Sequence, residues 1–246
     1  MSENNEISRR TFIAKGAVAG GAVVLAGAAG SALAGCSSSS SSSSTTAAGS
    51  SSQPGVGVGT PVRGGALNIG IVAEIDGFYP PNNHWDTSGY LYAQCIYDPL
   101  MAIAANGTIQ PYLAESCTPN STFDSYTLTL RPNIKFHDGS PLTAQVVVNN
   151  FTALKASLLT GQALTQVVSA TATGDLTVVY KLQAPNPGFT AGLATQVGYV
   201  VGQAMIDQAA AKVANPTPVG TGPFIFKDWQ PNNHFTCTRN PNYWRQ

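Results

Sequence analysis

Alternating apolar and polar residues predict several strands along the chain. In "SYTLTLR" (125–131) and "TVVYKL" (177–182) every second residue is apolar, which is the period of a half-buried strand. The apolar run "ALNIGIV" (66–72) has strand length, and two late strands are predicted at 224–226 and 234–239. The residues expected to face inward from the two clearest strands are Tyr126, Leu128, Leu130, Val178, Tyr180 and Leu182.

Between these strands, apolar residues recur at the spacing of a helix. The segment 140–159 opens with Ser140 and Pro141, a pair typical of a helix start, and a shorter helix is predicted over 202–213. In the first helix the expected buried stripe is Val147, Phe151, Leu154 and Leu158. Because strands and helices are mixed, the fold class is α/β or α+β.

The N-terminal segment has the layout of a targeting sequence. Adjacent Arg9 and Arg10 in "SRRTFIAK" precede an uncharged stretch over 16–34 that is mostly Ala and Gly. The paired arginines resemble a twin-arginine export signal, although Lys15 lies one residue later than in the usual pattern. The alternative is an uncleaved membrane anchor, for which this stretch is weakly apolar.

A single cysteine, Cys36, follows the targeting segment in "LAGC". This motif resembles the lipobox of bacterial lipoproteins, which implies that Cys36 carries a lipid and that residues 1–35 are a removed signal peptide. The serine-rich tract that follows, up to residue 60, holds no charge and no aromatic residue, so it is predicted to be a disordered tether spanning about 25–30 Å.

Composition after the tether excludes several functions. About 186 residues remain, enough for one sizeable core or two small lobes. The nine basic and ten acidic residues after Cys36 leave no charge excess for binding nucleic acid. The remaining cysteines, Cys95, Cys117 and Cys237, match no zinc or haem spacing. One disulfide among them is compatible with an exported protein, but the sequence does not identify which two cysteines would form it.

Catalytic motifs are absent from the sequence. The three histidines, His84, His137 and His234, form no HExxH pair, and there is no GxSxG, CxxC or Walker-type loop. His137 and Asp138 could act as an acid–base or metal pair, but "HDGS" is more typical of a turn in which Asp138 bonds its own backbone. No catalytic residue, cofactor or metal site is therefore expected.

Two further sets of residues have open roles. Gly220 and Gly222 in "PVGTGPF" allow a tight bend or a close backbone approach, and a hinge or a ligand contact is the functional alternative. Asp98 and Glu115 have no evident partner, and we expect them to be solvated or to cap a helix.

Seven segments, in order, resemble the extracellular substrate-binding proteins of the dipeptide/oligopeptide class (family 5), which serve ABC importers. They are "RGGALNIGI", "IYDPLM", "NGTIQPYLAES", "YTLTLRPNIKFHDGSPLTAQVV", "TVVYKLQAPNPGF", "PVGTGPFIFKDW" and "RNPNYWR". The resemblance runs from residue 63 to the end of the chain and implies an α/β fold of the periplasmic-binding-protein-like type II, two-lobed, with mixed sheets and flanking helices.

The resemblance also implies a domain organisation. Residues 61–95 and 187–246 would form an incomplete lobe I, and residues 96–186 an inserted α/β subdomain. Family members are about twice as long as this chain, so we expect it to stop before the second ligand-binding lobe. A second departure is Cys117, which stands where the family usually has an aromatic residue.

The function implied by the resemblance is capture of a peptide or other small solute outside the cytoplasm. Two lobes close on the ligand and present it to an ABC permease and its ATPase, while Cys36 holds the protein at the membrane. The loop "YPPNNHWDTSG" (79–89) aligns with a stretch that touches ligand in relatives. The expected ligand-binding residues are Trp85, His84, Asn83, Asp86, Gly220 and Gly222, with packing in the core as the alternative role for Trp85.

Two alternative functions remain open from the sequence. Within the same family, the solute could be a nickel complex or a sugar, although three scattered histidines give little support for a metal. From another class, an exported enzyme would need a catalytic constellation that the sequence does not show.

Overall fold

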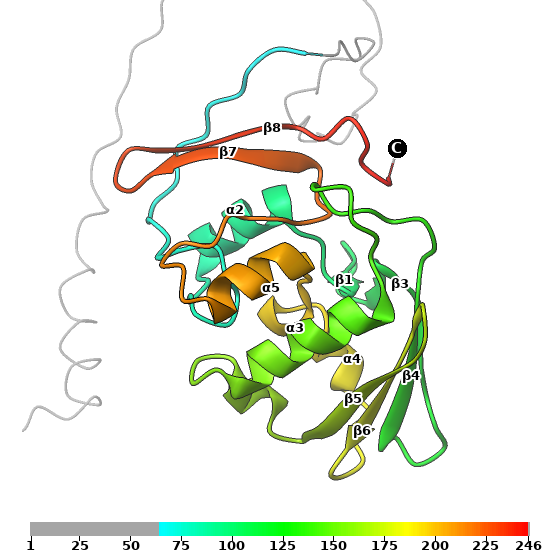
Figure 1. Cartoon of the computed structure of the whole chain (residues 1–246). Coiled ribbons are helices and arrows are strands. Elements are labelled where there is room, and N and C mark those ends of the chain that lie inside the picture. The colour runs from blue at the N-terminus through cyan, green and yellow to red at the C-terminus, as the bar shows by residue number, and fades with distance from the viewer. Residues whose placement is uncertain (1–63, 246) are drawn as a thin grey trace, which may run out of the picture. The chain divides into compact units, whose positions relative to one another are not determined.

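The computed structural model describes residues 64–245 (Figure 1). The predicted signal peptide, Cys36 and the predicted tether lie outside the described residues. None of the helices in the described region has the length and apolar character needed to cross a membrane. The helical elements are α2 (Thr87–Ile96), α3 (Ala144–Ala156), η1 (Gly161–Leu164), α4 (Phe189–Gly192), η2 (Gln196–Gly198) and α5 (Gln203–Ala210). The strands are β1 (Met101–Ile103), β2 (Ile109–Pro111), β3 (Ala114–Pro119), β4 (Ser125–Leu130), β5 (Val167–Gly174), β6 (Thr177–Leu182), β7 (Phe224–Gln230) and β8 (His234–Arg239).

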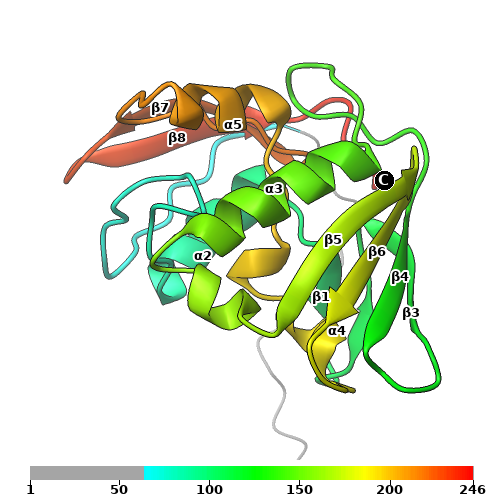
Figure 2. The same cartoon turned by 60° about the horizontal axis from the view of Figure 1, so that its bottom comes forward.

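The largest sheet has four antiparallel strands in the order β3-β4-β6-β5. Its register pairs Tyr126 with Tyr180 and Leu128 with Val178. These residues are almost fully buried, as are Leu130 and Leu182, so the strand faces predicted from alternation are confirmed. Helix α3 packs on this sheet (Figure 2), where the Phe151 ring meets Tyr180 at a centroid distance of 5.8 Å.

Helix α3 is shorter at both ends than the sequence predicts. It begins at Ala144, where the Thr143 hydroxyl caps it by accepting a bond from Val146 N at 3.3 Å. It ends at Ala156 because Ser157 is extended, so Leu158 lies beyond the helix and is 95% exposed. The stripe of Val147, Phe151 and Leu154 is buried as predicted; its extension to Leu158 is wrong.

The predicted strand at 66–72 is also wrong. The segment forms no strand, and Leu67, Ile69 and Val72 are largely exposed. A strand needs a neighbour that satisfies its backbone groups, and no described segment pairs with this one. The short helix predicted at 202–213 is confirmed as α5, which ends earlier, before Lys212 adopts a positive φ of 61°.

The two late strands are confirmed as one hairpin, β7–β8, which packs against α2 (Figure 1). The contact is aromatic: the Phe78 ring lies 5.4 Å from Phe226 and 5.2 Å from Trp229 between centroids, and Tyr92 of α2 meets Phe235 at 5.0 Å. Aromatic side chains bury large apolar areas, so this cluster holds the hairpin on the helix.

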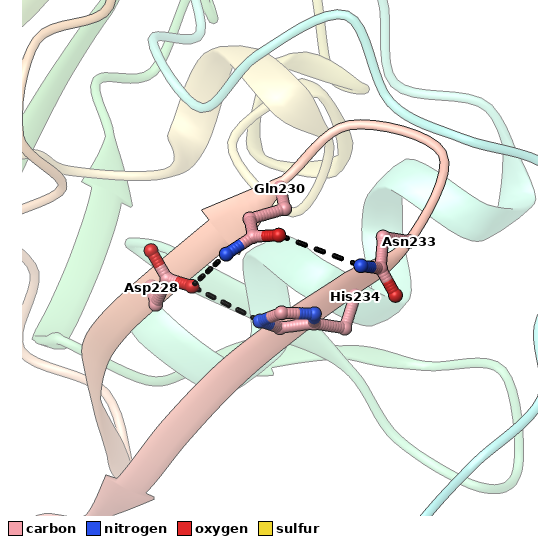
Figure 3. A network of polar contacts seen from close by, with 4 residues as sticks. All are labelled: Asp228, Gln230, Asn233 and His234. Atoms are coloured by element: carbon pink, nitrogen blue, oxygen red, sulfur yellow. Dashed lines mark hydrogen bonds and ion pairs between the residues drawn. The ribbon is translucent and has the colours of Figure 1, made fainter.

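Polar residues surround the exposed turn of this hairpin (Figure 3). His234 Nε2 and Asp228 Oδ2 lie 3.0 Å apart, and Gln230 links Asp228 to Asn233. The two side chains are 40% and 54% exposed, and a polar contact this open contributes roughly 0–1 kcal/mol to stability.

Candidate functional site

The loop at 79–89 is folded by its own polar groups. Asn83 Oδ1 accepts a bond from Tyr79 N at 3.0 Å, while Asn83 Nδ2 donates to the Asp76 carbonyl at 2.9 Å. Asp86 ends the loop and caps α2 by accepting a bond from Gly89 N at 2.9 Å. The amide of Asn83 is therefore used within the loop, whereas the His84 and Asp86 side chains are exposed.

Gln196, in the turn η2, fastens this loop to the rest of the protein. Its Nε2 donates to the carbonyls of Pro80 at 2.8 Å and Asn83 at 2.7 Å, and its Oε1 accepts a bond from Trp85 N at 3.3 Å. One side chain more than a hundred positions away thus fixes three points of the loop. The sequence analysis missed Gln196, because a single glutamine outside any motif carries no sequence signal.

Trp85 lies inside the protein. It is 5% exposed, stacks on Tyr97 with ring planes 10° apart, and meets Tyr199 edge-on at 5.4 Å. The described residues thus show the packing role considered for Trp85. A ligand contact by Trp85 stays a prediction, as it does for Asn83, His84 and Asp86.

Gly220 and Gly222 lie against the end of α2. Gly222 N donates to the Ile96 carbonyl at 2.8 Å, and a Cβ on Gly222 would be 2.5 Å from the Ile96 carbonyl carbon. A Cβ on Gly220 would be closer still to the Ile96 oxygen. Both glycines therefore allow the close backbone approach that the sequence suggested; a hinge or ligand role stays a prediction.

His137 forms hydrogen bonds with the backbone of Gly220 and Gly222. Its backbone N donates to the Gly220 carbonyl at 2.8 Å. Gly220 N donates to His137 Nδ1 at 3.4 Å, so Nε2 carries the ring proton and donates to the Gly222 carbonyl at 3.0 Å. Burial lowers the pKa of His137, which keeps the ring neutral, against opposing effects of that hydrogen bond and of nearby Asp98 and Asp138.

The turn role predicted for "HDGS" is confirmed. Asp138 Oδ1 accepts bonds from Ser140 N at 2.9 Å and from Ser140 Oγ at 2.6 Å, and Gly139 adopts a φ of 85°. Both ring nitrogens of His137 are engaged by backbone, so neither it nor Asp138 is arranged as an acid–base pair.

The expectation that Asp98 is solvated is wrong. Asp98 is 2% exposed and accepts three hydrogen bonds, from Trp244 Nε1 at 2.8 Å, Thr221 Oγ1 at 2.9 Å and Tyr243 OH at 3.2 Å. Burial raises the pKa of Asp98, and the three donors oppose that rise. Glu115, by contrast, is exposed as expected.

A groove of about 510 Å³ opens elsewhere on the described surface. Its lining residues come from 163–167, 182–189 and 192–197, and none of the predicted site residues is among them. Val197 lines the groove while its neighbour Gln196 holds the loop at 79–89, so η2 adjoins both surfaces. Within residues 64–245, no three His, Cys, Asp or Glu side chains come together as a metal ion would require.

The sequence profile described as "Bacterial extracellular solute-binding proteins, family 5 Middle" matches residues 108–246. The chain belongs to the bacterial extracellular solute-binding proteins, family 5. Members of family 5 are periplasmic or extracytoplasmic proteins that bind substrates for transport rather than enzymes.

Individual family 5 proteins are similar over the same region. The nickel-binding periplasmic protein of Escherichia coli K12 is 28% identical over 170 residues, which cover 67% of this chain and 32% of that protein. The probable D,D-dipeptide-binding periplasmic protein of the same organism is 27% identical and covers 66% and 32%. This chain spans about a third of the length of these curated relatives.

Solved structures establish the fold. A dipeptide-binding protein from Pseudoalteromonas sp. SM9913 in complex with Met-Leu superposes with a TM-score of 0.63 at 22% identity, covering 71% of this chain and 39% of that one. NikA from Brucella suis in complex with Fe(III)-EDTA gives 0.58 at 28% identity, covering 68% and 35%. The α/β fold of periplasmic-binding-protein-like type II is therefore confirmed.

The glycines at the end of α2 give a first prediction. Gly220→Ala should destabilise the protein by at least about 2 kcal/mol, because the new Cβ would collide with backbone that cannot move independently. Gly192→Ala is the matched control: its Cβ would enter open space within helix α4, so it should be neutral or slightly stabilising. Urea denaturation of both variants measures the difference, and equal stabilities would contradict the close approach.

The buried carboxyl of Asp98 gives a pH-dependent prediction. Because its pKa is raised in the folded state, its contribution to stability is fully present below the unfolded pKa and is lost as pH rises through the folded pKa. The free energy of unfolding of the wild type, minus that of Asp98→Asn, should therefore fall as pH rises from the unfolded-state pKa of Asp98 to its higher folded-state pKa. Denaturant titrations at a series of pH values measure it; a difference that stays flat or rises with pH would refute the assignment.

Proposed function

We propose that this protein is the extracytoplasmic substrate-binding component of an ABC importer, and that it captures peptides of the dipeptide or oligopeptide class. The observation that carries the proposal is the family 5 match over residues 108–246. Relatives named as binding D,D-dipeptides, glutathione and oligopeptides support a peptide-like ligand. The protein would release its ligand unaltered to a membrane permease driven by an ATPase.

The loop at 79–89 would form one wall of the ligand site. Its backbone is fixed by Asn83 and Gln196, so it would meet a ligand without first losing conformational freedom. The exposed side chains of Asp76, His84 and Asp86 would supply polar contacts at its rim, and Trp85 would support them from beneath. Closure of two lobes would then exclude water from the site.

A nickel complex is the second candidate ligand. The nickel-binding periplasmic protein of Escherichia coli is 28% identical to this chain, and a nickel-binding protein of Staphylococcus aureus is 31% identical. Because the described residues contain no cluster of metal ligands, a metal would be held here through its own small-molecule chelator.

A thermal-shift screen of the full-length protein distinguishes between these candidate ligands. The arms are a dipeptide pool, an oligopeptide pool, free Ni²⁺ and chelated Ni²⁺. A ligand at a hundred times its dissociation constant should stabilise the folded state by about 2.7 kcal/mol. A shift in a peptide arm supports the proposal, and a shift only in the chelated Ni²⁺ arm supports the second candidate. Conversion of any ligand to product, detected by mass spectrometry, would refute the binding-protein function.

Two histidine variants test the position of the site. His84→Ala should weaken binding of the active ligand about 3–10-fold by removing a polar contact at the rim. His234→Ala is the control, since this histidine is also exposed but lies at the turn of the β7–β8 hairpin. Equal affinities of the two variants would show that the ligand does not bind at the loop.

The mode of membrane attachment is a separate part of the proposal. Arg9 and Arg10 would direct export, and a lipid on Cys36 would hold the protein at the outer face of the cell membrane. Cys36→Ala should therefore move the protein from the membrane fraction to the soluble fraction of producing cells, as followed by immunoblotting. Retention of the variant in the membrane fraction would show that another segment anchors it.

A further inference from the structure

Two of the cysteines lie on α2 and β8, which contact each other through Tyr92 and Phe235. Cys95 lies in the last turn of α2, and Cys237 lies in the middle of β8, opposite Phe226 of β7. Both cysteines are partly buried, and Cys95 packs against the hydrophobic core. They are separated by about 140 residues of sequence.

An adjacent aromatic contact fixes how the helix and the strand are paired. Tyr92 of α2 meets Phe235 of β8 at a centroid distance of 5.0 Å. Cys95 follows Tyr92 by three residues and so lies on the same face of the helix, and Cys237 follows Phe235 by two and so lies on the same face of the strand. The next pair along this contact is therefore Cys95 with Cys237, and the two thiols are near enough for each to influence the pKa of the other.

The third described cysteine is on a different element. Cys117 lies in β3, where it pairs with Leu128 of β4, and it influences the pKa of Tyr126 and Tyr180 of the four-stranded sheet. Cys117 thus belongs to the four-stranded sheet, whereas Cys237 belongs to the separate β7–β8 sheet. This placement removes the ambiguity that three cysteines leave in the sequence.

We propose that Cys95 and Cys237 form a disulfide that fastens α2 to the β7–β8 hairpin once the protein leaves the cytoplasm. Family 5 proteins work in compartments where disulfides persist, which supplies the setting. The oxidant is a disulfide of the glutathione or disulfide-oxidoreductase class. One protein thiolate attacks it and forms a mixed disulfide, and the second displaces the remaining thiolate. The protein loses two electrons and two protons, and the oxidant is reduced to two thiols.

Burial slows thiol–disulfide exchange by this pair at neutral pH. It raises the pKa of Cys237 to about 11, with a further rise from Cys95, and burial also raises the pKa of Cys95. Few thiolates therefore exist at neutral pH, and oxidation in the test is carried out at mildly alkaline pH. Once formed, the bond would close a loop of about 140 residues and restrict the unfolded chain.

Peptide mapping tests the pairing directly. The full chain is incubated with oxidised glutathione, its free thiols are alkylated, and the monomeric fraction is digested with trypsin and a glutamate-specific protease. Cleavage after Glu74 and Glu115 separates Cys95 from Cys117, while trypsin releases Cys237 in residues 228–239. The expected product is residues 75–115 linked to residues 228–239, and it should disappear after reduction.

Stability measurements provide a second readout with matched variants. Oxidation should raise the Tm of the wild type by about 10 °C. The same rise is expected for Cys117→Ala, and none for Cys95→Ala, Cys237→Ala or the double variant. Alkylation of both Cys95 and Cys237 after oxidation, or a linked peptide that contains Cys117 or Cys36, would overturn the proposal.

Discussion

The end of helix α2 is the joint on which the described structure depends. Residues 96–98 closely contact later segments of the chain: Gly220 and Gly222 pack on the Ile96 carbonyl, and Asp98 accepts bonds from Thr221, Tyr243 and Trp244. The approach is so close that a side chain on either glycine would prevent it. One short segment thus brings together parts of the chain more than 120 positions apart.

The candidate ligand loop depends on the same joint. Tyr97 stacks on Trp85, and its hydroxyl donates to the Phe78 carbonyl at 3.1 Å, so the residue between Ile96 and Asp98 supports the loop from inside. Gln196 holds the loop from the other side. Displacement of the joint would therefore shift the loop even though no residue of the loop is itself changed. Stability and the geometry of the candidate site are coupled in this way.

Much of the fold could be predicted from the sequence wherever a local pattern was sufficient. Alternation placed Tyr126 and Tyr180 on the buried face of the sheet, because the faces of a strand follow from its own residues. Segment 66–72 has the same apolar character but forms no strand, since pairing depends on a second segment that the pattern does not identify. Likewise, helical spacing indicated the stripe of α3 but not its end at Ala156, which left Leu158 exposed.

The candidate site was harder to predict, because its main residues act through distant partners. Asp98 carries no local sign of burial; its three donors lie 123 to 146 positions later in the chain. Gln196 belongs to no motif, yet its side chain makes three hydrogen bonds to the loop. The resemblance to family 5 located the loop at 79–89, and only the structure shows which atoms hold it.

The polar residues at the loop fall into two groups, those that bond its backbone and those that are exposed. The amides of Asn83 and Gln196 are occupied by backbone partners, so they set the shape of the loop and have little capacity left for a ligand. His84 and Asp86 are exposed, and their outward polar atoms can change without altering the backbone beneath, apart from the capping oxygen of Asp86. The loop thus separates the residues that hold its backbone from those that present polar atoms to solvent. Such a separation is physically compatible with relatives that share the fold and are named for different ligands.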